Sequence, residues 1–255
     1  MTEFAKFGSL RGKRVFITGG GSGIGEALVT AFAEQGALVA FVDIAKDASE
    51  ALAERIGAAG HTAPLFRNCD ITDIGALQST IAELADKLGD FDVLVNNAAN
   101  DQRHDAENVT LEYWNERIAI NQRPMFFTCQ SVLAGMKRQG GGSIINVSSI
   151  SWHAKGAGYP VYATTKAAVV GLTRSLARDL GPHGIRVNTV TPGWVMTQRQ
   201  VDLWVDDAAE AEIKRMQCLP GKLMPAHIAS MILFLAADDS AMCTSQEFIV
   251  DAGWV

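Results

Sequence analysis

The stretch RVFITGGGSGIGEALVTAFAEQGALVAFVD, which spans Arg14–Asp43, decides the fold. It begins with a β-rich run, continues into a cluster of glycines, and then shows helical apolar spacing that stops at Gly36. The following run, Leu38–Val42, is continuously apolar, as expected of a strand that is buried on both faces. Strand, tight turn, helix and strand in this order predict a first βαβ unit.

The rest of the chain repeats this alternation of apolar runs and helical patterns. Further strands are predicted at Pro64–Asn68, Val93–Val95, Ser143–Val147, Arg186–Val190 and Phe248–Val250. Helices are predicted at about Ala48–Ala58, Ile74–Leu88, Leu111–Gln139 as one long helical stretch, Tyr162–Leu180 and Ala226–Ala237. The sequence therefore predicts an α/β fold, a single-domain doubly wound parallel sheet (Rossmann-like) with helices on both faces, over residues 1–255. The polar segment 194–221 interrupts the rhythm and is predicted to be a lid.

Composition excludes several classes of partner. The 255 residues carry a formal net charge of −6 and no basic patch, which argues against a nucleic-acid partner. No run of about 20 apolar residues is present for a membrane span, and the first residues, MTEFAKFGSLRGKR, lack the apolar core of a signal peptide. The four cysteines show neither C-x-x-C pairing nor metal-ligand spacing with the histidines. We therefore expect a cytoplasmic protein with reduced thiols and no metal site.

The glycine cluster predicts a nucleotide site. It fits the pattern Thr-Gly-x-x-x-Gly-x-Gly with Gly19, Gly23 and Gly25, between a strand and a helix, where backbone amides and the helix N-terminus can face a pyrophosphate. A glycine-rich turn without a ligand is the alternative.

Two carboxylates follow the strands on that side. Asp43 lies 18 residues beyond Gly25, close to the roughly 20 expected of a carboxylate that accepts from the adenosine ribose. It would repel a 2′-phosphate, and no cation adjoins it, so NAD is favoured over NADP. Asp70 follows the third strand, where it either meets the adenine edge or serves as a helix N-terminal carboxylate.

A second constellation predicts acid–base chemistry. Tyr162 and Lys166 are four residues apart, so on a helix they project from the same face, and Ser149 lies thirteen residues upstream of Tyr162. A free tyrosine has a pKa of about 10, and a neighbouring ammonium lowers it toward the range of a useful base. Ser149 would hold the substrate oxygen. A lysine that snorkels past a half-buried tyrosine is the alternative for this spacing alone.

Together these motifs resemble the short-chain dehydrogenase/reductase family over nearly the full length. The matching stretches are TGGGSGIG at Thr18–Gly25, NNAA at Asn96–Ala99, Ser149, YATTK at Tyr162–Lys166, and Pro192-Gly193. The resemblance implies an NAD(P)-dependent oxidoreductase in which Tyr162 is the acid/base, Lys166 lowers its pKa and binds the nicotinamide ribose, Ser149 orients the substrate and Asn121 holds a water of the proton relay. Ala99 departs from the glycine that is usual in the family.

The same resemblance assigns further residues. Besides Gly19, Gly23, Gly25, Asp43, Asp70, Tyr162 and Lys166, it implies cofactor contacts from Ser22, Ile24, Ile71, Asn97, Ala98, Pro192, Gly193, Val195 and Thr197. It also implies a homotetramer, with the helices near Leu111–Gln139 and Tyr162–Leu180 as interfaces.

A closer resemblance is to the bacterial sugar dehydrogenases of this family, which act on pentoses and hexoses at C1. The stretches NAANDQRH, SISWH, TQRQ, QCL and DAGWV carry it. It implies NAD-dependent oxidation of an aldose to a lactone, and a polar and aromatic rim suits a polyol. The expected substrate contacts are Asn100, Ser149, His153, Tyr159, Tyr162 and Trp194.

Three alternatives remain at this stage. Within the family they are a polyol dehydrogenase or a 3-oxoacyl thioester reductase, although the acidic chain and Asp43 disfavour the latter. From another class comes a nucleotide-sensing protein without catalysis, against which the intact set of Ser149, Asn121, Tyr162 and Lys166 argues.

Overall fold

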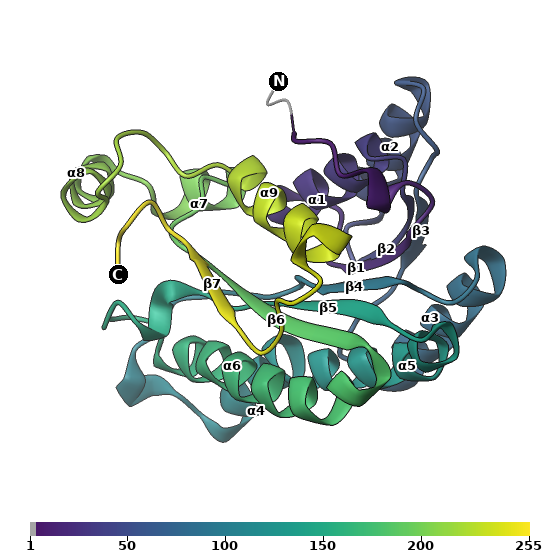
Figure 1. Ribbon diagram of the computed structural model, residues 1–255. Coiled ribbons are helices and arrows are strands. Elements are labelled where there is room, and N and C mark those ends of the chain that lie inside the picture. Colours follow the sequence, from purple (N-terminus) through teal and green to yellow (C-terminus); the bar gives the residue numbers. More distant parts are fainter. Residues whose placement is uncertain (1–3) are drawn as a thin grey trace.

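The computed structural model describes residues 4–255, and within that range seven strands form one parallel sheet. The strand order is β3-β2-β1-β4-β5-β6-β7 (Figure 1). Every pair of neighbours is parallel, and the order reverses between β1 and β4. The predicted α/β fold with a doubly wound parallel sheet is confirmed.

The elements alternate along the chain as the sequence predicts. The strands are β1 Arg14–Thr18, β2 Leu38–Asp43, β3 Leu65–Asn68, β4 Val93–Asn96, β5 Gly142–Val147, β6 Ile185–Pro192 and β7 Glu247–Val250. The helices are α1 Gly23–Glu34, α2 Lys46–Ala58, α3 Ile74–Leu88, α4 Leu111–Asn121, α5 Arg123–Gln139, α6 Pro160–Leu180, α7 Gln198–Trp204, α8 Asp207–Met216 and α9 Pro225–Ala236. In the predicted lid segment the structure has two short helices, α7 and α8.

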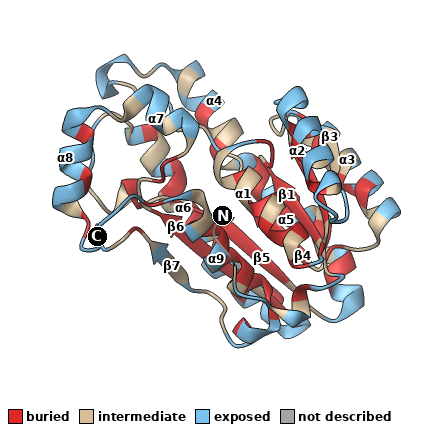
Figure 2. Cartoon of the chain, turned by 90° about the horizontal axis from the view of Figure 1, so that it is seen from above, coloured by how far each residue is buried: buried red, intermediate tan, exposed pale blue. Residues whose placement is uncertain are grey.

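The sheet separates two apolar layers. Alternate residues of a strand point to opposite faces, so Val15 and Ile17 pack with α1 and α9 while Phe16 packs with α3 and α5. Figure 1 shows α1, α2 and α9 on one face of the sheet and α3 to α6 on the other. The central strands are buried on both faces (Figure 2), which explains why they read as unbroken apolar runs.

The single helical stretch predicted at Leu111–Gln139 is wrong at one point. The helix breaks at Gln122, whose backbone angles are φ −129° and ψ −54°. Pro124 follows in the first turn of α5, where its ring excludes a continuous i to i−4 ladder. The break separates α4 from α5 and leaves Asn121 at the end of α4, next to the site described below.

The described helices contain none that is long and apolar enough to cross a membrane.

Candidate active site

A cleft of about 850 Å³ opens at the carboxyl ends of the parallel strands. Ligands of open α/β sheets bind at this edge, near the point where the strand order reverses. The cleft is lined by every residue expected to bind the cofactor: Gly19, Ser22, Gly23, Ile24, Gly25, Asp43, Asp70, Ile71, Asn97, Ala98, Tyr162, Lys166, Pro192, Gly193, Val195 and Thr197.

The glycine loop after β1 has the shape of an anion cradle. Gly19 has φ +68°, and a Cβ there would lie 2.8 Å from Ala98 Cα. A Cβ on Gly25 would lie 1.8 Å from the Gly19 carbonyl oxygen, so only glycine fits. Because side chains are excluded, a pyrophosphate can approach the backbone at the start of α1, and the residues present fit a dinucleotide.

Asp43 braces this loop from the end of β2. Its Oδ2 accepts a hydrogen bond from Gly21 N, and its Oδ1 accepts one from Ala45 N, both at 2.8 Å. Each carboxylate oxygen has a second acceptor site, which leaves capacity for a ribose hydroxyl. Within residues 4–255, this end of the cleft is lined by Asp43, Ile44, Ala45 and Asp70 and by no Lys or Arg side chain.

The structure separates the roles of two neighbouring aspartates. Asp73 is the N-cap of α3, and its side chain accepts from Ala76 N at 2.9 Å. Asp70 accepts from Thr72 N at 2.9 Å and lines the cleft. The N-cap of the helix is therefore Asp73, and a contact of Asp70 with the adenine edge stays a prediction.

Lys166 lies beneath the predicted base. It is 1% exposed, its Nζ donates to the Val147 carbonyl oxygen at 2.8 Å, and it lies 5.7 Å from the centre of the Tyr162 ring. Burial lowers the pKa of Lys166 to about 8, and the negative charge of Asp101 opposes that fall. The amine is therefore held near the phenol by the end of β5.

The sequence predicts that Lys166 lowers the pKa of Tyr162, but in the protein without cofactor the pKa of Tyr162 is raised. Burial of the phenol raises the pKa of Tyr162, the charge of Asp101 raises it further, and the Ser149 hydroxyl opposes the rise. Desolvation dominates because the phenolate is the charged form.

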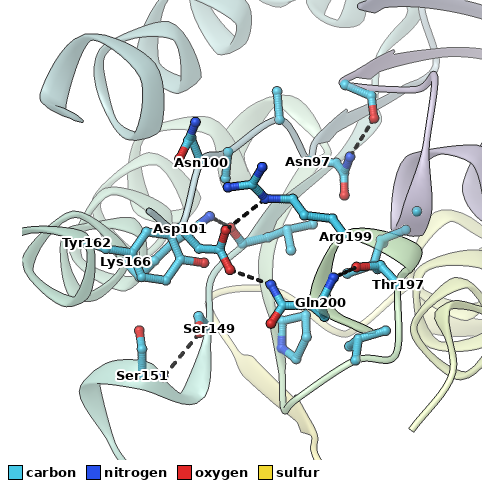
Figure 3. A pocket seen from close by; sticks show the side chains of 18 of the residues that line it. Asn97, Asn100, Asp101, Ser149, Ser151, Tyr162, Lys166, Thr197, Arg199 and Gln200 are labelled. Atoms are coloured by element: carbon cyan, nitrogen blue, oxygen red, sulfur yellow. Dashed lines mark hydrogen bonds and ion pairs between the residues drawn. The ribbon is translucent and has the colours of Figure 1, made fainter. Parts of the chain in front are cut away.

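The serines after β5 are arranged as an acceptor and a donor for an oxygen ligand. Ser149 caps the short 3-10 turn Ile150–Trp152, and its Oγ accepts from Ser151 N at 3.1 Å. The Ser151 hydroxyl is buried and has no hydrogen-bond partner among residues 4–255. Both side chains line the cleft beside Tyr162 (Figure 3).

Asn121 acts on the loop after β4. Its Oδ1 accepts from Asn100 N at 2.7 Å and its Nδ2 donates to Asn100 O at 3.1 Å. Asn121 is buried and does not line the cleft, so its side chain holds the backbone of a residue that does.

Of the expected substrate contacts, Asn100, Ser149, Tyr159, Tyr162 and Trp194 line the cleft and His153 does not. The imidazole Nε2 of His153 pairs with Glu247 Oε1 at 3.0 Å, and the ring stacks on Trp152 at 3.5 Å between centroids. The assignment of His153 as a substrate contact is therefore corrected. His153 follows Ser149 by four residues, but its ring points to Glu247 of β7 and not into the cleft.

A polar network across the cleft was missed by sequence reasoning. Asp101, after β4, forms an ion pair with Arg199 at 3.3 Å and accepts from Gln200 Nε2, both residues of α7 (Figure 3). Gln200 Oε1 accepts from Trp194 Nε1 at 2.9 Å. The sequence shows these polar side chains in two separate loops, but their pairing spans almost a hundred residues and leaves no local signal.

Aromatic rings complete this end of the cleft. The guanidinium of Arg103 lies 4.4 Å from the centre of the Trp204 ring. Trp254, near the end of the chain, lies 6.2 Å from Trp194 and also lines the cleft. Polar groups beside half-buried aromatic rings suit a polyol.

Comparison with known proteins finds relatives along nearly the whole chain. The profile of a family described as enoyl-(acyl carrier protein) reductase matches residues 19–255. D-xylose 1-dehydrogenase of Caulobacter vibrioides is 49% identical over 250 residues, which cover 98% of each chain. A probable galactose dehydrogenase of Rhizobium meliloti is 47% identical over 249 residues, 98% of this chain and 97% of the other. Among solved structures, a short-chain dehydrogenase/reductase from Serratia marcescens matches with a TM-score of 0.90 and 34% identity, covering 96% of this chain and 99% of that one.

Proposed function

This chain belongs to the short-chain dehydrogenase/reductase family, and from that premise we propose that it is an NAD-dependent aldose 1-dehydrogenase. The reaction is oxidation of the anomeric C1 hydroxyl of a pentose or hexose to a lactone. The observation that carries the proposal is one cleft in which Ser149, Tyr162 and Lys166 adjoin both the glycine cradle and a polar, aromatic end. The 47–49% identity to two sugar dehydrogenases supports an aldose as the substrate.

The chemistry follows from the side chains. Ser149 and Tyr162 hold the anomeric hydroxyl, and the Tyr162 phenolate takes its proton. The C1–H electron pair leaves as hydride, and C1 becomes a carbonyl carbon that is already bonded to the ring oxygen, which is a lactone. Bound NAD supplies the hydride acceptor and a positive charge. Lys166 adds its own charge beside the phenolate, held there by Val147 O.

Asp43 supports NAD as the preferred cofactor. A carboxylate at the end of β2 accepts from a ribose hydroxyl but repels a 2′-phosphate. Because its two oxygens also hold Gly21 N and Ala45 N, Asp43 cannot turn away without breaking the loop. Within the described chain, the cationic residues that line the cleft are Arg103, Lys166 and Arg199, and their contacts are with Trp204, Val147 O and Asp101 and not with Asp43.

We also propose that the chain forms a homotetramer, as the family resemblance implies. The face of α4, α5 and α6 supports it: Phe126 is 44% exposed beside a hollow of about 280 Å³ that Ile118, Phe127 and Leu172 also line. Light scattering on the purified protein gives the mass directly, and a monomer would contradict this assignment.

The test of the proposed function is a panel of aldoses, polyols and 3-oxoacyl thioesters with NAD and with NADP. We expect NADH formation with at least one pentose or hexose, little with polyols, and kcat/KM for NADP lower by about tenfold or more. Oxidation of polyols but not of aldoses would favour a polyol dehydrogenase instead.

The panel also separates the remaining alternatives. The description of the matching family profile names a carrier-protein reductase. Such an enzyme needs a basic surface to bind its acidic carrier protein. A chain with a net charge of −6 does not favour such a surface. NADPH-dependent reduction of thioesters with no aldose oxidation would support it. Cofactor binding without turnover of any substrate would support a nucleotide sensor.

A further inference from the structure

Asp101 lies in the cleft without a role in the reaction described so far. Its carboxylate is 29% exposed, and it is close enough to the catalytic pair for its charge to raise the pKa of Tyr162 and to oppose the fall at Lys166. Figure 3 shows the Asp101 carboxylate turned toward Arg199 and Gln200, the second and third residues of α7. A negative charge near a phenol that must ionise opposes that ionisation, and Asp101 lines the same cleft as Ser149 and Tyr162.

Asp101 is held by two sets of contacts, one to the backbone of its neighbour Asn100 and one to its own side chain. The preceding residue, Asn100, is held at both backbone groups by Asn121, so the loop cannot move the carboxylate away. The side-chain partners of Asp101 are Arg199 and Gln200 on α7, in the segment predicted to be a lid. Arg199 is half-exposed, and its contact with Asp101 at 3.3 Å is an exposed ion pair of small energy.

An ionised carboxylate is an acceptor only, and this decides which part of an aldose it can meet. The anomeric carbon has two polar neighbours besides its own hydroxyl. The ring oxygen is an acceptor and would be repelled by Asp101, whereas the C2 hydroxyl can donate. Ser149 and Tyr162 would hold the anomeric hydroxyl. The C2 hydroxyl is next to it on the sugar, so it would be the hydroxyl that donates to the Asp101 carboxylate.

We propose that Asp101 is the specificity-determining acceptor for the C2 hydroxyl of the aldose, and that it selects 2-hydroxy sugars over 2-deoxy sugars. The inference rests on the proposed function, because it places the anomeric hydroxyl at Tyr162. Gln200 and Arg199 donate to the Asp101 carboxylate, and its remaining lone pairs can accept from the sugar. Trp194, bonded to Gln200, closes the same corner of the cleft.

The test pairs galactose with 2-deoxygalactose in the wild-type protein and in Asp101→Ala. We expect kcat/KM to fall by about 10- to 100-fold for the 2-deoxy sugar in the wild type, the range for a lost hydrogen bond to a charged group. Loss of the electron-withdrawing C2 oxygen favours hydride departure, so this fall runs against intrinsic reactivity. In Asp101→Ala, the two sugars should be oxidised with kcat/KM values within about threefold of each other.

Two further variants keep the inference falsifiable. Asp101→Asn retains shape and an acceptor oxygen, so the ratio between the sugars should be smaller than in the wild type but still above one. Arg199→Ala removes the ion pair and leaves the Asp101 carboxylate in place. It should therefore change kcat/KM by the same factor for both sugars, so that the ratio of the two kcat/KM values stays as in the wild type. NADH binding, followed by fluorescence, should be the same in all variants.

The outcomes are distinct. Equal losses for both sugars in Asp101→Ala, with the ratio kept, would make Asp101 structural and overturn the inference while the proposed function stands. A wild type that oxidises 2-deoxygalactose as well as galactose would also overturn it. A wild type that oxidises no aldose would overturn both.

Discussion

Asn121 and Asn100 are joined by two hydrogen bonds, in which the side chain of the first holds the backbone N–H and C=O of the second at 2.7 and 3.1 Å. The contact ties the break between α4 and α5 to the loop that carries Asp101. Together with Tyr113 of α4, whose hydroxyl donates to Gln102 O at 3.3 Å, it links the helical layer to the substrate end of the cleft.

Replacement of Asn121 by alanine should loosen that loop. Two backbone groups lose their partners, which costs about 1–3 kcal/mol of unfolding free energy. The value of kcat/KM for the aldose should fall, and NADH affinity should change little, because the glycine cradle is untouched. Urea denaturation and NADH fluorescence measure the two effects.

Asn108→Ala is the matched control, since Asn108 is an exposed asparagine in a short turn of the same loop region. Its unfolding free energy should stay within about 0.5 kcal/mol of the wild type. If Asn121→Ala behaved like Asn108→Ala, the two hydrogen bonds would not be the anchor of the loop.

Gly25→Ala should abolish the nucleotide site. The new Cβ would lie 1.8 Å from the Gly19 carbonyl oxygen, so the turn must shift. We expect NADH affinity to fall by about 100-fold or more, with a loss of about 1–3 kcal/mol in stability. Calorimetric titration with NADH measures the affinity.

Gly75→Ala is the matched control, because Gly75 lies in α3 at a position where a Cβ fits. The nearest atom to its Cβ would be Asp73 Oδ1 at 3.5 Å, an ordinary contact. This variant should gain roughly 0.5–1 kcal/mol and bind NADH normally. A Gly25→Ala protein with wild-type affinity would refute the close-approach argument.

Burial of Lys166 predicts a specific dependence of stability on pH. Its pKa is about 8 in the folded chain and 10.5 when unperturbed, so between these values the unfolded chain holds a proton that the folded chain has released. The unfolding free energy therefore rises with pH in that window. Relative to Lys166→Met, the wild type should gain about 2 kcal/mol between about pH 7 and about pH 9.5.

Paired urea titrations of the two proteins across this range make the measurement. The raised pKa of Tyr162 keeps its titration above the window. A constant difference between the two proteins would mean that Lys166 keeps an ordinary pKa in the folded chain.

Local signals predicted the fold, and they brought Gly19, Gly25 and Asp43 to the lining of one cleft. The apolar runs of β1 and β2 and the glycines between them lie in one continuous stretch, so spacing alone placed Gly19, Gly25 and Asp43. Contacts between distant segments were not predictable in this way. His153 lies four residues after Ser149 in the sequence, but its ring points to Glu247, which is 94 residues away.

The other misses have different causes. The expectation of one helical stretch over Leu111–Gln139 followed the apolar spacing and left out a local signal, the backbone restriction at Pro124 beside the break. The spacing of Tyr162 and Lys166 correctly placed the amine near the ring but carries no information on desolvation, which decides the direction of the pKa in the chain alone. The pairing of Asp101 with Gln200 joins residues 99 positions apart, so it leaves no local signal in the sequence.

The measurement that tests the account most directly compares the wild type with Tyr162→Phe, using an aldose and NAD and following both NADH and the lactone. The phenol hydroxyl is the only group removed, so NADH should still bind to Tyr162→Phe. The account predicts that the wild type forms lactone and NADH in equal amounts and that turnover in Tyr162→Phe falls by about 100-fold or more. A Tyr162→Phe protein that still oxidises the sugar at the wild-type rate would contradict the central claim.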